Sequence, residues 1–226
     1  EFLIERFNED KKQKIIGKLG KQIYLTQYQQ NPKIAPEGAL WNYTLIQNTK
    51  DHNFYSYSVD QLRQLLDKIF IGVDPAMSNN KNSDETGIIV AGFSTSMQRY
   101  IVLEDGSGKY SPEAWASKVN SLYDKWRANY IMVEKNQGGD MILDLLHRHN
   151  RILPVTLIHA TYGKFSRAEP IAMLYEKGLV YHMNGLEKLE NQLMYFDPKN
   201  STHSPDRMDA MVYAIQELAR KISTFG

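Results

Sequence analysis

The sequence predicts an α/β fold with a mixed central sheet, in which three antiparallel strands are followed by parallel strands and helices cover the faces. Three short apolar segments come first, at 69–74, 87–93 and 99–103, with the spacing of antiparallel neighbours joined by loops. Helical and strand-like segments then alternate as far as a final helix. Strands reached through helical crossovers pair in parallel with right-handed connections, so the complete sheet is expected to be mixed.

Length and composition restrict the class of protein. The chain has 226 residues, 42% of them hydrophobic and 23% charged, which indicates one large globular domain or one domain with an appended piece. With 27 Lys plus Arg against 26 Asp plus Glu, no overall field attracts a polyanion, so any nucleic-acid binding has to be local. The absence of cysteine excludes disulfides and Cys-rich zinc sites. Apolar stretches are far shorter than the roughly 20 residues of a membrane helix, and we expect a soluble protein that is not secreted and has no membrane partner.

The first 57 residues differ from the rest. Residues 1–30 have helical propensity and carry several lysines, ending at an Asn-Pro pair. Residues 32–57 show no clear period and are expected to be linker-like chain packed against a neighbour. Because the sequence opens in a helical pattern without a methionine, we expect a fragment of something longer.

Two helix starts carry capping signals. Ser58 and Gln61 have the spacing of a capping box and open a short predicted helix ending near Lys68. Ser111 is a favourable cap, and Pro112 stands at the first helical position, where no hydrogen bond is lost. The later predicted elements are a strand at 130–134, helices at 138–149 and 166–177, strands at 154–158 and 179–183, and helices at 186–194 and 206–222.

Acidic residues stand where predicted strands end. Asp74 ends the first strand and Glu134 ends the first strand after a crossover, so both project from one edge if these strands are parallel neighbours. Asp209 lies at the start of the last helix, beside an apolar stripe that can dock on the sheet. Taken singly, an Asp before a proline is a common turn starter, and Asp209 favours its helix terminus. Together the acids would repel one another unless cations neutralise them, and oxygen ligands favour Mg²⁺ or Mn²⁺.

Several motifs in order resemble the nuclease domain of the large terminase subunit of tailed bacteriophages and prophages, which has a ribonuclease H-like fold. The motifs span about residues 69–220 and read GVDPA with SDETGIIVAG, VEKNQGG, GKFSRAEPIAMLYEKGLVYH and SPDRMDAMVYAIQEL. The earlier stretch YLTQYQQNPKIAPEGALW is similar to the end of the family's ATPase motor domain. The resemblance therefore suggests a motor tail at 1–57 and a ribonuclease H-like nuclease domain at 58–226.

The resemblance implies a DNA endonuclease that cuts concatemeric phage genomes at the start and end of packaging, in the cytoplasm of the bacterial host. It implies double-stranded DNA as substrate, and an N-terminal ATPase domain, the small terminase subunit and the portal protein as partners. The metal-binding catalytic acids fall on Asp74, Glu134 and Asp209, with Asp206 and Asp84 as lesser candidates. Two ions about 3.5–4 Å apart, bridged by Asp74, would drive in-line hydrolysis without a covalent intermediate.

Basic residues near these acids are candidate phosphate contacts, which position DNA without reading bases and fit weak sequence preference. Lys164 and Arg167 lie in a loop leading into a predicted helix whose amino end also favours phosphate, although an ordinary exposed loop remains an alternative. Further candidate DNA contacts flank the acids: Lys135, Lys199 and Arg207. Supporting residues, expected to orient Glu134 or allow close approach, are Asn136, Gln137, Gly138 and Gly139.

Other functions stay open at this point. Another ribonuclease H-like nuclease, such as a junction resolvase or an RNA-strand nuclease, would share the acids, and a non-catalytic DNA-binding or docking module would carry them as relics. An ATP-driven motor needs a phosphate-binding GxxxxGK loop followed by Ser or Thr, and the nearest match, at 87–92, continues with Phe93 inside a predicted strand. The sequence given is therefore not expected to be the ATPase.

Overall fold

The computed structural model describes residues 38–76, 85–135, 139–159, 163–196 and 204–223. The helix expected within 1–30 lies outside this part of the chain. So do five candidate site residues: Asp84, Asn136, Gln137, Gly138 and Lys199.

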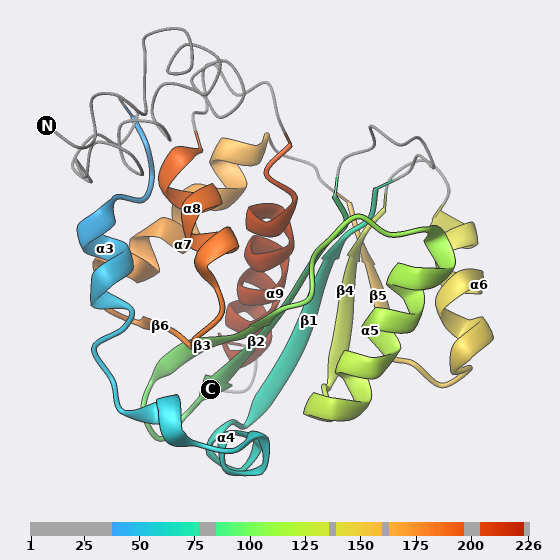
Figure 1. Ribbon diagram of the computed structural model, residues 1–226, viewed down its shortest axis with the longest axis horizontal. Helices are drawn as coiled ribbons and strands as arrows, with labels where there is room; N and C mark the ends of the chain where they lie inside the picture. Colours follow the sequence, from blue (N-terminus) through green and yellow to red (C-terminus); the bar gives the residue numbers. More distant parts are fainter. Residues whose placement is uncertain (1–37, 77–84, 136–138, 160–162, 197–203, 224–226) are drawn as a thin grey trace, which may run out of the picture.

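A six-stranded mixed sheet forms the centre of the molecule, in the order β5-β4-β1-β2-β3-β6 (Figure 1). The first three strands are antiparallel neighbours, whereas β4 pairs with β1, β5 with β4, and β6 with β3 in parallel. This confirms the predicted mixed sheet. The strands are β1 Lys68–Asp74, β2 Gly87–Ser94, β3 Arg99–Asp105, β4 Tyr130–Glu134, β5 Val155–Ile158 and β6 Val180–His182.

Helices cover both faces of the sheet (Figure 1). On one face α5 and α6 pack over Ile71 and Val73, while on the other α9 packs over Phe70 and is itself covered by α7 and α8. Alternate residues of β1 therefore enter two separate cores, as the period of two along a strand requires. The helical elements are α3 Tyr43–Asn48, the 3-10 turn Phe54–Ser56, α4 Val59–Leu65, α5 Pro112–Trp126, α6 Gly139–His149, α7 Lys164–Glu176, α8 Glu187–Tyr195 and α9 Asp206–Ser223. None of the helices in the described ranges is long and apolar enough to cross a bilayer.

The capping predictions are confirmed, but one helix ends earlier than expected. The Ser58 N–H donates to the Gln61 side chain at 2.8 Å, and the Gln61 N–H donates to the Ser58 hydroxyl at 3.3 Å. Helix α4 nevertheless stops at Leu65, because Leu66 adopts an extended conformation and Lys68 already pairs with β2. Strand pairing thus outweighs the helical propensity of the last few residues.

Two glycines let α9 lie directly on the sheet. A Cβ atom at Gly72 would stand 1.9 Å from the Ala210 carbonyl oxygen, and one at Gly87 would stand 1.9 Å from the Asp206 carbonyl oxygen. Only glycine permits so close an approach of two backbones. The start of α9 is therefore held against β1 and β2, beside the end of β1.

The segment at 41–57, expected to be linker-like, packs into the same core as the sheet. Trp41 is fully buried and meets Tyr175 of α7 edge to face at 5.7 Å between ring centroids. The Lys50 ammonium pairs with Glu190 of α8 at 2.8 Å, and Glu190 also contacts the buried His182 at 3.1 Å. This part of the chain is bound to α7, α8 and β6 by both apolar and polar contacts.

Removing the Trp41 ring should strongly destabilise the protein. We expect Trp41→Ala to lower the free energy of unfolding by about 3–5 kcal/mol, because it leaves a large cavity in the core. Urea denaturation measures the change, with Tyr43→Ala as control, since Tyr43 is exposed on the adjoining helix. Equal stability of the two variants would mean that residues 41–57 do not contribute to the core.

Candidate metal centre

Two of the predicted acids lie side by side at one edge of the sheet. Strands β1 and β4 are parallel neighbours with Val73 opposite Val133, so Asp74 and Glu134 follow at adjacent carboxyl ends. Their side chains share a hydrogen bond. The condition on which the sequence argument depended, adjacent parallel strands, is met.

The last helix brings two more acids to this edge. Asp206 and Asp209 lie in the first turn of α9, and both are buried. Burial raises the pKa of Asp74 to about 9, and its hydrogen bond with Glu134 and the charges of Glu134, Asp209 and Asp206 add to the rise. Asp74, Glu134, Asp206 and Asp209 are called the acidic cluster below. Their crowding makes full ionisation unfavourable unless positive charge is brought in.

Positive charge is supplied by α7. The Lys164 ammonium lies 2.7 Å from Asp209 Oδ2, and the Arg167 guanidinium lies 3.2 Å from Asp209 Oδ1 and 3.5 Å from Glu134 Oε1. Burial raises the pKa of Asp209, and both cations act in the opposite direction. Helix α7 begins at Lys164, two residues before the predicted start. The predicted start was wrong, because Lys164 and Phe165, expected to lie in a loop, are already helical. Residues 164 and 167 are therefore one turn apart on a helix, where side chains three apart share a face.

Tyr213 is a site residue that sequence reasoning missed. Its ring lies beneath the Arg167 guanidinium, 5.0 Å from the ring centroid, and its hydroxyl accepts a hydrogen bond from Arg167 Nη1. Burial raises the pKa of Tyr213, and the charge of Glu134 adds to this effect. Tyr213 follows Asp209 by four residues on α9, and this spacing was the signal that could have found it.

The other described candidates occupy different positions. Arg207 is buried and pairs with Asp105 at 2.9 Å and with Glu85, so that it ties the start of α9 to the end of β3 and to the segment that leads into β2. Lys135 is exposed, directly after Glu134. Gly139 begins α6, where an added Cβ would meet the Lys135 side chain at 2.7 Å. Of the predicted basic residues in the described ranges, Lys164 and Arg167 contact the acidic cluster.

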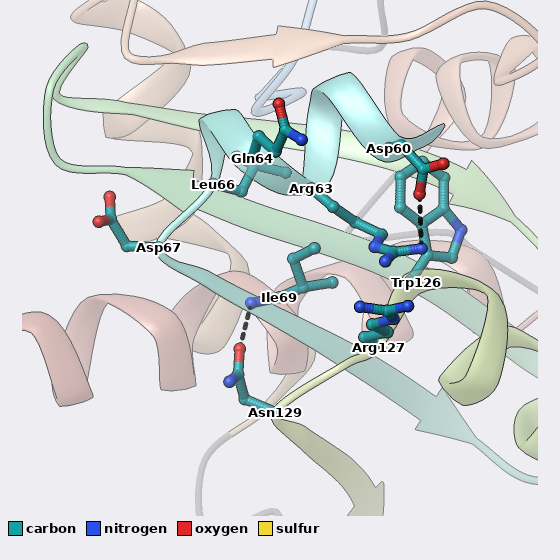
Figure 2. Close-up of a pocket in the computed structure, with 9 residues that line it drawn as sticks. All are labelled: Asp60, Arg63, Gln64, Leu66, Asp67, Ile69, Trp126, Arg127 and Asn129. Carbon is teal, nitrogen blue, oxygen red and sulfur yellow. Dashed lines mark hydrogen bonds and ion pairs between the residues drawn. The ribbon is translucent and has the colours of Figure 1, made fainter. Parts of the chain in front are cut away.

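A separate cavity of about 530 Å³ lies at the opposite end of β1, between α4 and the end of α5 (Figure 2). Its charged lining is balanced, with Asp60 and Asp67 against Arg63 and Arg127, and Arg63 pairs with Asp60 at 2.9 Å. The six residue steps of β1 place it roughly 20 Å from Asp74, at about 3.3 Å per residue. The cavity is therefore not part of the acidic cluster.

The chemistry of the acidic cluster suits a hard divalent ion. In the described part of the chain, no three His, Asp or Glu side chains stand in a ready-made arrangement around one ion position. Lys164 pairs with Asp209, and Arg167 pairs with both Asp209 and Glu134. These carboxylates therefore face the two cations and not a common ion position. The donors are carboxylate oxygens, the ligands that Mg²⁺ and Mn²⁺ prefer. Buried acids with this much mutual repulsion are groups that a divalent ion would stabilise.

The fold and the site together define a ribonuclease H-like domain with clustered acids at adjoining strand ends. The sequence matches the family model described as the terminase RNaseH-like domain over residues 71–218, and the chain belongs to this family. No curated protein matches the sequence.

Solved structures show the same fold. The human cytomegalovirus terminase nuclease domain, manganese-soaked and inhibitor-bound, is 12% identical with a TM-score of 0.57, covering 78% of this chain and 94% of that one. The nuclease domain of the bacteriophage SPP1 large terminase with bound manganese is 17% identical with a TM-score of 0.51, covering 72% and 93%. The large terminase nuclease of the thermophilic phage G20c with bound zinc is 16% identical with a TM-score of 0.51, covering 66% and 81%.

Proposed function

We propose that this chain is the metal-dependent DNA endonuclease part of a terminase large subunit. The observation that carries the proposal is the cluster of carboxylates, most of them buried, that β1, β4 and α9 bring to one sheet edge in a member of the terminase RNaseH-like domain family. The similar terminase nuclease structures with bound manganese or zinc support the same activity. The proposed reaction is the cutting of concatemeric phage DNA at the start and end of genome packaging.

Asp74, Glu134 and Asp209 would hold Mg²⁺ or Mn²⁺, two ions in the proposed reaction, with Asp206 as an additional acid. When bound, the ions would activate the attacking water and stabilise the departing 3′ oxygen of the phosphodiester. The chain's own contribution is position: burial excludes bulk water from Asp74, and Arg167 on the Tyr213 ring orients Glu134 and Asp209. Cutting needs no covalent intermediate on the protein.

The wider assembly is part of the proposal. Residues 1–57 would be the tail of an ATPase motor domain, and the small terminase subunit and the portal protein would be the packaging partners in the host cytoplasm. Lys135 and Lys164 would contact backbone phosphates of double-stranded DNA, which gives affinity without sequence preference. Lys199 is a further proposed contact.

A plasmid cleavage assay tests the proposed activity. We expect nicked and linear products from supercoiled DNA with Mn²⁺ or Mg²⁺ and none with EDTA. Asp60→Asn should cut as well as the wild type, because Asp60 is an exposed acid on α4 at the other end of β1. No cleavage with either ion would contradict the proposal and favour a non-catalytic module. Faster cutting of four-way junctions or RNA–DNA hybrids than of duplex DNA would favour another ribonuclease H-like nuclease.

A further inference from the structure

Two cations reach the same carboxylate, and the structure holds them in different ways. Arg167 is buried, lies over the Tyr213 ring and contacts both Glu134 and Asp209. Lys164 is the first residue of α7, and 40% of its side chain is exposed. Its ammonium contacts Asp209 Oδ2 at 2.7 Å and the Ser204 hydroxyl at 2.8 Å.

This difference decides which cation can leave. Arg167 is fixed by an aromatic ring and two acids, and its departure would leave buried charges unpaired, which is costly. Lys164 carries a compact charge on a flexible stem that already reaches solvent, so it can turn away without opening the core. The oxygen it occupies belongs to a proposed metal ligand. An ammonium and a divalent ion repel each other and cannot both contact that oxygen closely.

We propose that Lys164 is the exchangeable counter-ion of the acidic cluster. Its ammonium pairs with Asp209 while no divalent ion is bound, and it moves away from Asp209 Oδ2 when an ion binds. The released ammonium, at the exposed start of α7, then becomes a contact for a DNA phosphate. Metal binding and DNA binding therefore strengthen each other, since such coupling is reciprocal. The inference rests on the proposed metal-dependent nuclease function.

Calorimetric titration of the full chain with Mn²⁺ alone, without DNA, tests the competition directly. We expect Lys164→Gln to bind Mn²⁺ about tenfold more tightly than the wild type, a change of about 1.4 kcal/mol. The substitution removes the competing ammonium but none of the proposed ligands. Lys164→Arg keeps a cation at this position, and its affinity should stay close to that of the wild type.

Lys177→Gln is the matched control. Lys177 is the exposed C-cap of the same helix, so its loss changes the net charge equally without contacting the acidic cluster. An unchanged or weaker affinity in Lys164→Gln, or an equal gain in Lys177→Gln, would overturn the inference while leaving the nuclease proposal intact. A wild-type chain that binds no Mn²⁺ would overturn both. Circular dichroism of each variant checks that it is folded.

Discussion

Asp74→Asn should nearly abolish DNA cleavage and should also stabilise the metal-free protein. Asn keeps the size of the side chain but removes a charge proposed to hold the divalent ions. We expect at least about a thousandfold loss of cleavage rate, or about 4 kcal/mol of transition-state stabilisation. The gain in stability follows from the acids that surround Asp74. Asp74 is buried against Glu134 and near Asp206 and Asp209, so its ionised form is unfavourable in the fold.

The pH dependence of this gain has a definite sign. The pKa of Asp74 is about 9 in the folded protein and 3.8 ordinarily, so between these values the folded state binds the extra proton. Stability contributed by the protonated acid is then lost as the pH rises toward 9, and Asn does not have this loss. The advantage of Asp74→Asn over the wild type in EDTA should therefore grow from pH 5 to pH 9, reaching at least about 1.4 kcal/mol, the value of one pKa unit.

Urea denaturation at several pH values measures this difference, with Asp60→Asn as the control acid. A constant difference in stability across the pH range would show that burial and the neighbouring acids do not raise the pKa of Asp74. Unchanged cleavage in Asp74→Asn would remove this acid from the proposed reaction.

Gly72→Ala should disrupt both the fold and the site. The new Cβ would stand 1.9 Å from the Ala210 carbonyl oxygen and 3.0 Å from the Ala214 nitrogen, and both are backbone atoms that cannot turn aside. Helix α9 would have to move away from β1, at a cost of about 3 kcal/mol or more, the upper range for overpacking. Because α9 carries Asp206 and Asp209, cleavage should fall with stability.

Thermal unfolding and cleavage should be measured on the same sample. Gly163→Ala is the control, since a Cβ there meets nothing within 4 Å. Wild-type stability of Gly72→Ala would contradict the close packing of α9 on the sheet.

Sequence patterns predicted the sheet edge and its acids because these depend on local signals. Apolar strands that end in Asp74 and Glu134, with helical crossovers between them, restrict where the acids can lie, and the register of β1 with β4 agrees. The capping box at Ser58 likewise depends on four neighbouring residues. Local spacing was sufficient in each case.

The roles of the basic residues could not be predicted in the same way. A cation at a helix start can face solvent or a neighbouring helix, and only the packing of α7 on α9 directs Arg167 to Asp209, 42 residues along the chain. Arg207 meets Asp105 across 102 residues. Trp41 gave no signal, because the segment around it has no periodic pattern and is buried by distant helices. Long-range contacts decided these positions.

We propose that Asp74, Glu134 and Asp209 hold divalent ions together. A crystal of the full chain soaked in Mn²⁺, measured for anomalous scattering, tests it most directly. We predict anomalous density in contact with all three carboxylates, with the Lys164 ammonium displaced from Asp209. Density elsewhere, or none beside Asp74 at saturating Mn²⁺, would contradict the account.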